Sequence, residues 1–96
     1  MDDVVEFILA VKGLDPHVEQ ACLHGGCYRF HKVLAMAFAG AVPYMNAERD
    51  HVVTRVGNVL YDVTGRIGSV TGKAGDAYHR MDDTEIRVAE KWGVRK

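Results

Sequence analysis

Residues 51–65, HVVTRVGNVLYDVTG, constrain the fold of this chain more than any other segment. Two runs rich in β-branched residues flank the dipeptide Gly57-Asn58, a pattern typical of a β-hairpin with a two-residue turn. Pairing Val56 with Val59 across the turn fixes the register of every other pair. We therefore expect an antiparallel sheet with a defined buried face.

Helical patterns lie on both sides of this hairpin. Residues 2–13 carry an apolar stripe behind a capping aspartate, and a glycine ends the pattern. Residues 27–40 repeat apolar side chains at helical spacing. Residues 82–92 open with Asp82 and, three positions later, Glu85, which is a capping-box spacing. We expect a helix over each segment.

The remaining segments complete the fold class. Residues 41–44, AVPY, predict a short edge strand, because Pro43 has no N–H to donate to a neighbouring strand. Residues 64–80 hold recurring small and turn-forming residues, so we expect mostly loop there. Helices, then a small antiparallel sheet, then a closing helix define an α+β fold. We expect a single domain over residues 1–96, with N-terminal helices packed on the sheet and a C-terminal helix.

The composition argues against several classes of protein. The 12 basic and 13 acidic residues give a formal net charge of −1, so we expect neither nucleic acid nor a membrane surface as a partner. The longest apolar run, residues 33–42, is too short to span a bilayer. The acidic N-terminus lacks the basic start of a secretory signal, so we expect two reduced thiols and a cytoplasmic protein.

Cys27 follows a double glycine and opens the helix expected over residues 27–40. Backbone N–H groups and the positive dipole end at such a position favour a thiolate and could stabilise an oxyanion. The hairpin register places His51 and Asp62 on one face as diagonal neighbours, about 7 Å apart between their Cα atoms. If the helix packs on that face, the three side chains form a nucleophile, base and orienter, as in acyl-transfer enzymes.

This combination resembles the papain-like superfamily of cysteine hydrolases. A cysteine after GG, a histidine opening HVVTRV and an acid in LYDVTG are most similar to its transglutaminase-like and bacterial cell-wall peptidase branches. The match covers about residues 20–65, roughly half of the chain. The resemblance implies a papain-like minimal core, with Cys27 as nucleophile, His51 as general base, Asp62 as the orienting residue and Gln20 as an oxyanion-hole donor.

These features predict a small cysteine hydrolase or acyltransferase that acts on an amide or isopeptide bond and needs no metal or other cofactor. Its substrate would be a protein or peptide. His51 would take the thiol proton and return it to the leaving group. The alternative is a catalytically inactive interaction module of the same fold, for example a phage or mobile-element inhibitor, that binds a protein partner.

Other interpretations of the cysteine segment stay open. Cys27 shares a helix face with His31, so it could be a small buried thiol of the core. The string of Cys22, His24, Cys27 and His31 holds zinc-type ligands, although one short contiguous string seldom wraps a tetrahedral ion. Otherwise Cys22 and His24 are bystanders on a turn. Near the basic C-terminal tip, we expect Trp92 to pack on the core rather than serve as an exposed anchor.

Overall fold

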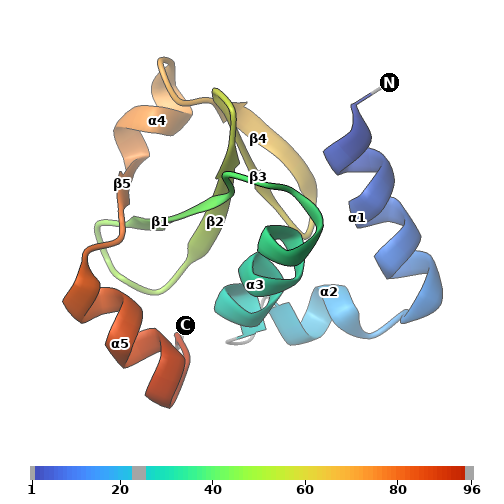
Figure 1. Ribbon diagram of the computed structural model, residues 1–96, viewed down its shortest axis with the longest axis horizontal. Coiled ribbons are helices and arrows are strands. Elements are labelled where there is room, and N and C mark those ends of the chain that lie inside the picture. Colours follow the sequence, from blue (N-terminus) through green and yellow to red (C-terminus); the bar gives the residue numbers. More distant parts are fainter. Residues whose placement is uncertain (1, 23–25, 95–96) are drawn as a thin grey trace.

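The computed structural model describes residues 2–22 and 26–94 and has a Cα radius of gyration of 12.3 Å. N-terminal helices precede a five-stranded antiparallel sheet, and a helix closes the chain (Figure 1), so the predicted α+β class is confirmed. The elements in chain order are α1 (Asp3–Leu14), α2 (Val18–Ala21), α3 (Cys27–Ala37), β1 (Val42–Asn46), β2 (Val52–Val56), β3 (Val59–Asp62), β4 (Gly65–Ser69), α4 (Lys73–Ala77), β5 (Tyr78–Arg80) and α5 (Asp83–Trp92).

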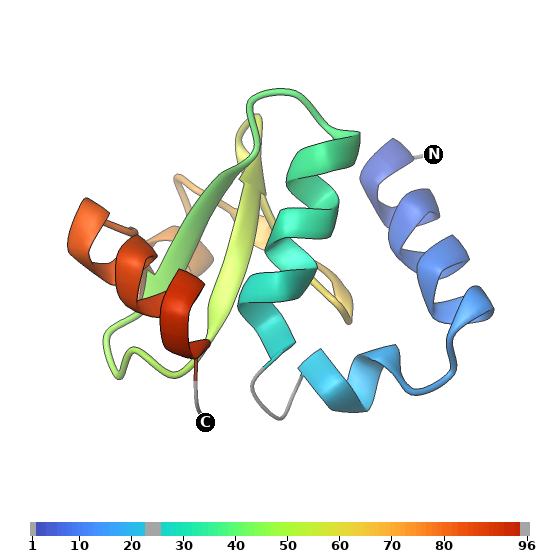
Figure 2. The same ribbon diagram turned by 60° about the horizontal axis from the view of Figure 1, so that its bottom comes forward.

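Helix α3 is the central helix and packs on the sheet. The strand order is β4-β3-β2-β1-β5, and every neighbouring pair is antiparallel. Figure 2 shows α3 lying on the sheet between α1 and α5. One apolar cluster on the α1 side includes Ile8 and Leu34, and a second cluster on the α5 side includes Cys27, Met45 and Ala89. The start of α3 therefore lies at the boundary between two apolar clusters.

The predicted hairpin is confirmed together with its register. Strands β2 and β3 pair from Val56–Val59 to Thr54–Tyr61. Gly57 has a φ angle of 62°, in the left-handed region that a tight hairpin turn requires and that glycine adopts without strain. The alternation of side chains along both strands is therefore the one that the sequence predicts.

The prediction of an edge strand at residues 41–44 is wrong, because β1 pairs with both β2 and β5. Pro43 is tolerated there because the pairing with β5 covers only Tyr44 to Asn46. Beside Pro43, the N–H of Met81 donates to the Pro43 carbonyl oxygen at 3.0 Å between nitrogen and oxygen. The proline nitrogen thus faces the residue after β5, where it cannot return the bond from Met81, and the pairing of β1 with β5 ends there.

The prediction of mostly loop over residues 64–80 is also wrong, since β4, α4 and β5 lie there. Two of the glycines that suggested a loop serve close packing instead. A Cβ atom on Gly68 would lie 2.9 Å from the Ala74 Cβ, and one on Gly75 would lie 1.6 Å from the Val70 carbonyl oxygen. Glycine at these positions lets α4 pack directly against β4 and the turn that follows it.

Side-chain caps fix the first and last helices where the sequence predicts them. Asp2 accepts a hydrogen bond from the Val4 N–H at 2.9 Å, and Asp82 and Glu85 form a complete capping box. Trp92, at the end of α5, is 69% exposed, so the expectation that it packs on the core is wrong. In the described part of the chain, no helix is both long enough and apolar enough to cross a membrane.

Candidate active site

Cys27 is the first residue of α3, as the sequence predicts. Gly26 precedes it, and a Cβ atom on Gly26 would lie 2.7 Å from the carbonyl oxygen of Ala21. Only glycine therefore allows the chain to pass this close to the end of α2. The other glycine of the predicted pair, Gly25, lies outside the described residues. Backbone packing at Gly26 thus helps to place the cysteine at the start of its helix.

His51 and Asp62 meet as the hairpin register predicts. The distance between His51 Nε2 and Asp62 Oδ2 is 3.1 Å, and the two side chains are 14% and 12% exposed. The second carboxylate oxygen of Asp62 accepts hydrogen bonds from the N–H and the hydroxyl group of Thr64. Burial raises the pKa of Asp62, but hydrogen bonds from His51 and Thr64 outweigh it, and the pKa is lowered overall. Asp62 is therefore a carboxylate held in one orientation toward His51.

The Cys27 sulfur lies beside His51 at the start of β2. The N–H of Val52, the residue after His51, donates to Cys27 Sγ at 3.3 Å between nitrogen and sulfur. The hydrogen bond to Asp62 and the nearby Cys27 thiol raise the pKa of His51 to about 9, against the opposing effect of burial. Among the described residues, no aligned hydrogen bond reaches the buried Nδ1 atom of His51. At neutral pH the His51 ring is therefore doubly protonated and positively charged. It lies near both the Cys27 thiol and the Asp62 carboxylate.

The turn before β2 is held by Asn46, a residue that our sequence reasoning missed. Asn46 Oδ1 accepts hydrogen bonds from the N–H groups of Asp50 and His51, each at 3.0 Å, and the Asn46 side-chain amide donates to the Asp50 carboxylate. Asparagine side chains often form hydrogen bonds with nearby backbone groups in turns, and this preference could have identified Asn46 from the sequence. Tyr78 of β5 also lies near His51, with 6.2 Å between ring centroids. The sequence analysis did not identify Tyr78, because it predicted mostly loop over residues 64–80.

The site is closed in this conformation. Cys27 is 5% exposed, and the cavity that it lines with His51 and Asp62 has a volume of about 10 Å³, close to the space that one water molecule needs. Cys22 and Phe30 line the same cavity. Burial raises the pKa of the Cys22 thiol to about 11, followed by smaller contributions from Cys27 and Asp62. Cys22 is therefore not the bystander that the sequence suggested but a neutral thiol in the wall of the site.

The other candidate residues lie apart from this cavity or belong to the core. Gln20 is exposed on α2 and is not among the residues that line the cavity, so the structure does not bring it to Cys27. His31 Nδ1 lies 2.8 Å from Thr54 Oγ1, and burial lowers the pKa of His31 to about 4, so this histidine is neutral. His24 of the zinc string lies outside the described residues. Within the part that the structure describes, no three His, Cys, Asp or Glu side chains are grouped to hold a metal ion.

The family match extends over nearly all of the chain. A model of the Phage YunG-like protein family matches residues 5–92, which include Cys27, His51 and Asp62. The chain therefore belongs to the Phage YunG-like protein family. Searches among curated proteins and among solved structures gave no match. The family description names no reaction, so the function has to be argued from the geometry of the site.

Proposed function

We propose that this member of the Phage YunG-like family is a small papain-like cysteine hydrolase or acyltransferase that acts on an amide or isopeptide bond. Cys27, His51 and Asp62 would carry the reaction. The observation that supports this most is the environment of His51, whose ring is bonded to the partly buried carboxylate of Asp62 and lies next to the buried thiol of Cys27. Both groups raise the pKa of His51. Such perturbed groups cluster at functional sites. We place the protein in the cytoplasm, where its two free cysteines would stay reduced.

In the proposed reaction, the thiolate of Cys27 attacks the carbonyl carbon of the substrate while the thiol proton rests on His51. N–H groups in the first turn of α3 would stabilise the oxyanion. His51 then donates its proton to the leaving amine, the C–N bond breaks, and a thioester remains on Cys27. Water or an acceptor amine attacks this thioester and restores the thiol. Asp62 would hold the His51 ring by its bond to Nε2, which leaves Nδ1 for proton transfer.

Formation of an acyl-enzyme tests the proposal without a known substrate. With p-nitrophenyl acetate, we expect release of p-nitrophenolate and a single acetyl group on Cys27, located by mass spectrometry of peptides. Cys27→Ala should abolish acetylation while its circular dichroism spectrum stays that of the wild type. His51→Gln should slow it by about a hundredfold, the typical contribution of a general acid or base. His79→Gln, which alters an exposed histidine of β5, is the matched control. Equal acetylation of Cys22 and Cys27, or an unchanged rate in His51→Gln, would contradict the proposal.

A second candidate function is a catalytically inactive interaction module that binds a protein partner. It is favoured by the burial of Cys27 and by a cavity of about 10 Å³, which admits no substrate in this conformation. This function predicts that iodoacetamide alkylates Cys27 at neutral pH no faster than Cys22. It also predicts that Cys27→Ala recovers the same partner as the wild type in a pull-down. Rapid, selective alkylation of Cys27 would exclude it.

A further inference from the structure

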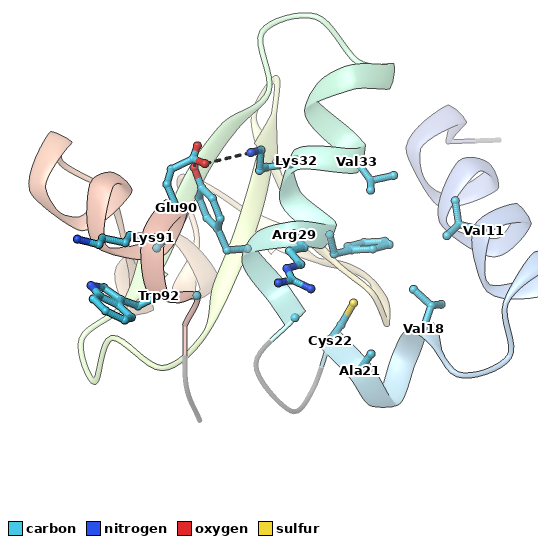
Figure 3. Close-up of a pocket in the computed structure, with 15 residues that line it drawn as sticks. Val11, Val18, Ala21, Cys22, Arg29, Lys32, Val33, Glu90, Lys91 and Trp92 are labelled. Atoms are coloured by element: carbon cyan, nitrogen blue, oxygen red, sulfur yellow. Dashed lines mark hydrogen bonds and ion pairs between the residues drawn. The ribbon is translucent and has the colours of Figure 1, made fainter.

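An open groove of about 670 Å³ crosses α3 on the side of the molecule between α5 and the α1–α2 pair. Figure 3 shows Val11 and Val18 on one side of this groove, Trp92 on the other, and Arg29 of α3 between them. The volume is in the range of sites that bind small molecules or short peptide segments, whereas the closed cavity at Cys27 is far smaller. The groove is therefore the place where this face of the protein offers room for a ligand.

The charges that line the groove are mostly positive. Arg29, Lys32 and Lys91 contribute cations, and Glu90 is the one acidic residue among the described lining residues. Both oxygens of Glu90 are occupied: Tyr28 donates its hydroxyl hydrogen at 2.8 Å and Lys32 donates at 3.0 Å, the latter drawn as a dashed line in Figure 3. Lys32 and Glu90 thus neutralise each other. Arg29 and Lys91 remain as cations that an anionic ligand could pair with.

The groove also offers apolar surface next to these cations. Trp92 is 69% exposed and carries the Lys91 ammonium group 5.2 Å from its ring centroid. Val33 of α3 lines the groove and is 40% exposed. A ligand that alternates acidic and apolar side chains would therefore match both kinds of surface.

Two residues are shared by the groove and the closed cavity. Cys22 and Phe30 line both, so their side chains form the wall between the groove and Cys27. Figure 3 shows the Cys22 sulfur directed from α2 toward α3 and the Arg29 side chain nearby. A modest displacement of the small Cys22 side chain would connect the two spaces.

We propose that this groove binds an acidic, partly apolar peptide segment of the substrate and that the bond to be cleaved reaches Cys27 through the wall formed by Cys22 and Phe30. The inference rests on the proposed function, whose site it extends. Arg29 would pair with a carboxylate of the peptide, and Trp92 would cover one of its apolar side chains. The groove would thus select substrates by charge before the thiol acts on them.

Binding can be measured directly because Trp92 is the only tryptophan of the chain. A hexapeptide of alternating glutamate and leucine, acetylated at its N-terminus and amidated at its C-terminus, should change the fluorescence of Trp92 until binding saturates. Added salt should weaken the binding. The corresponding peptide with lysine in place of glutamate should not bind. Arg29→Gln should weaken binding about three- to fivefold, as expected for loss of one exposed ion pair. Arg80→Gln, which removes an exposed arginine of β5, should not. Equal binding of both peptides, or no binding of the acidic one, would overturn the proposal.

The route to Cys27 is tested by the same acidic peptide carrying an N-terminal chloroacetyl group. Wild-type protein should form a thioether to this peptide at Cys27 faster than to chloroacetamide at equal concentration, and the lysine peptide should show no such gain. Cys22→Ala should speed this labelling and Cys22→Leu should slow it, with both folds checked by circular dichroism. Labelling confined to Cys22, or no labelling of wild-type Cys27, would refute the route. If labelling fails but p-nitrophenyl acetate still acetylates Cys27, the groove proposal fails alone; if neither reagent modifies Cys27, the proposed function fails.

Discussion

The substitution Asp62→Asn tests the electrostatics of the site without removing its shape. The asparagine side chain is nearly isosteric with aspartate, and its oxygen can still accept the hydrogen bonds from Thr64. What it lacks is the negative charge 3.1 Å from His51 Nε2. Because the bond to Asp62 is the largest cause of the raised His51 pKa, that pKa should fall toward its ordinary value in the variant, while the Cys27 thiol still opposes the effect of burial.

The size of the effect follows from linkage between protonation and folding. The folded-state pKa of His51 is raised from 6.5 to about 9, so the protonated ring stabilises the folded protein. This contribution is fully present below pH 6.5, declines as the pH rises through 9, and is absent above it. A shift of this size corresponds to at most about 3 kcal/mol, and we expect about 2 kcal/mol at pH 7 because both side chains keep some contact with water.

Urea unfolding followed by circular dichroism at about pH 6, 7 and 9.5 measures this contribution. We expect Asp62→Asn to lower the free energy of unfolding by about 1–2 kcal/mol at the two lower pH values, since Asp62 supplies the larger part of the His51 shift, and by less than about 0.5 kcal/mol at the highest. An NMR titration of His51 should show its pKa falling in the variant. Asp76→Asn, on the exposed surface of α4, controls for loss of one negative charge. Parallel pH dependence in wild type and Asp62→Asn, or a wild-type His51 that titrates near 6.5, would refute the reasoning.

Two further sets of substitutions test the packing around the site. Gly26→Ala should lower the free energy of unfolding by about 1–3 kcal/mol, because its Cβ atom would lie 2.7 Å from the Ala21 carbonyl oxygen. Gly13→Ala, whose new Cβ atom would meet no described atom within 4 Å, should instead raise it by up to about 1 kcal/mol. Thr54→Val removes the partner of His31 and should cost about 1–3 kcal/mol for the buried ring nitrogen left unpaired. Urea unfolding measures all three, and equal stabilities of the two alanine variants would contradict the packing argument.

The sequence predicted those parts of the fold that local residues determine. The turn at Gly57 and the β-branched runs around it fixed the register of the hairpin, and the capping box fixed the start of α5. The sequence could not distinguish glycines of a loop from glycines of close packing. Gly68 and Gly75 are needed because α4 lies against β4 and its turn, which no local pattern encodes. Pro43 likewise indicated an edge strand because the sequence does not show that β5 ends just beside it.

The candidate site likewise has features that the local sequence predicts and features that depend on the packing of the whole chain. The meeting of His51 and Asp62 followed from the alternation of side chains in one hairpin, which is a local property. The nearness of Cys22 to Cys27, the closed cavity and the exposed Trp92 depend on how α3 and α5 are rotated on the sheet. Rotation about a helix axis is set by the whole core, so a helical pattern predicts the buried stripe but not its neighbours.

The ring of His51 is held by Asp62 through Nε2, and no aligned hydrogen bond from a described residue reaches its buried Nδ1 atom, although the Cys27 thiol is near enough to raise the pKa of the ring. A buried polar group without a partner costs about 1–3 kcal/mol, and a buried ion pair is often matched in stability by apolar side chains of similar volume. The proposed proton transfer would give this nitrogen a use that stability alone does not require. The closed cavity of about 10 Å³ opposes function only if the resting conformation must hold the substrate. In the proposed mechanism, a groove occupant that displaces Cys22 would open the closed site and bring the substrate to the sulfur of Cys27, where His51 would donate its Nδ1 proton to the leaving amine.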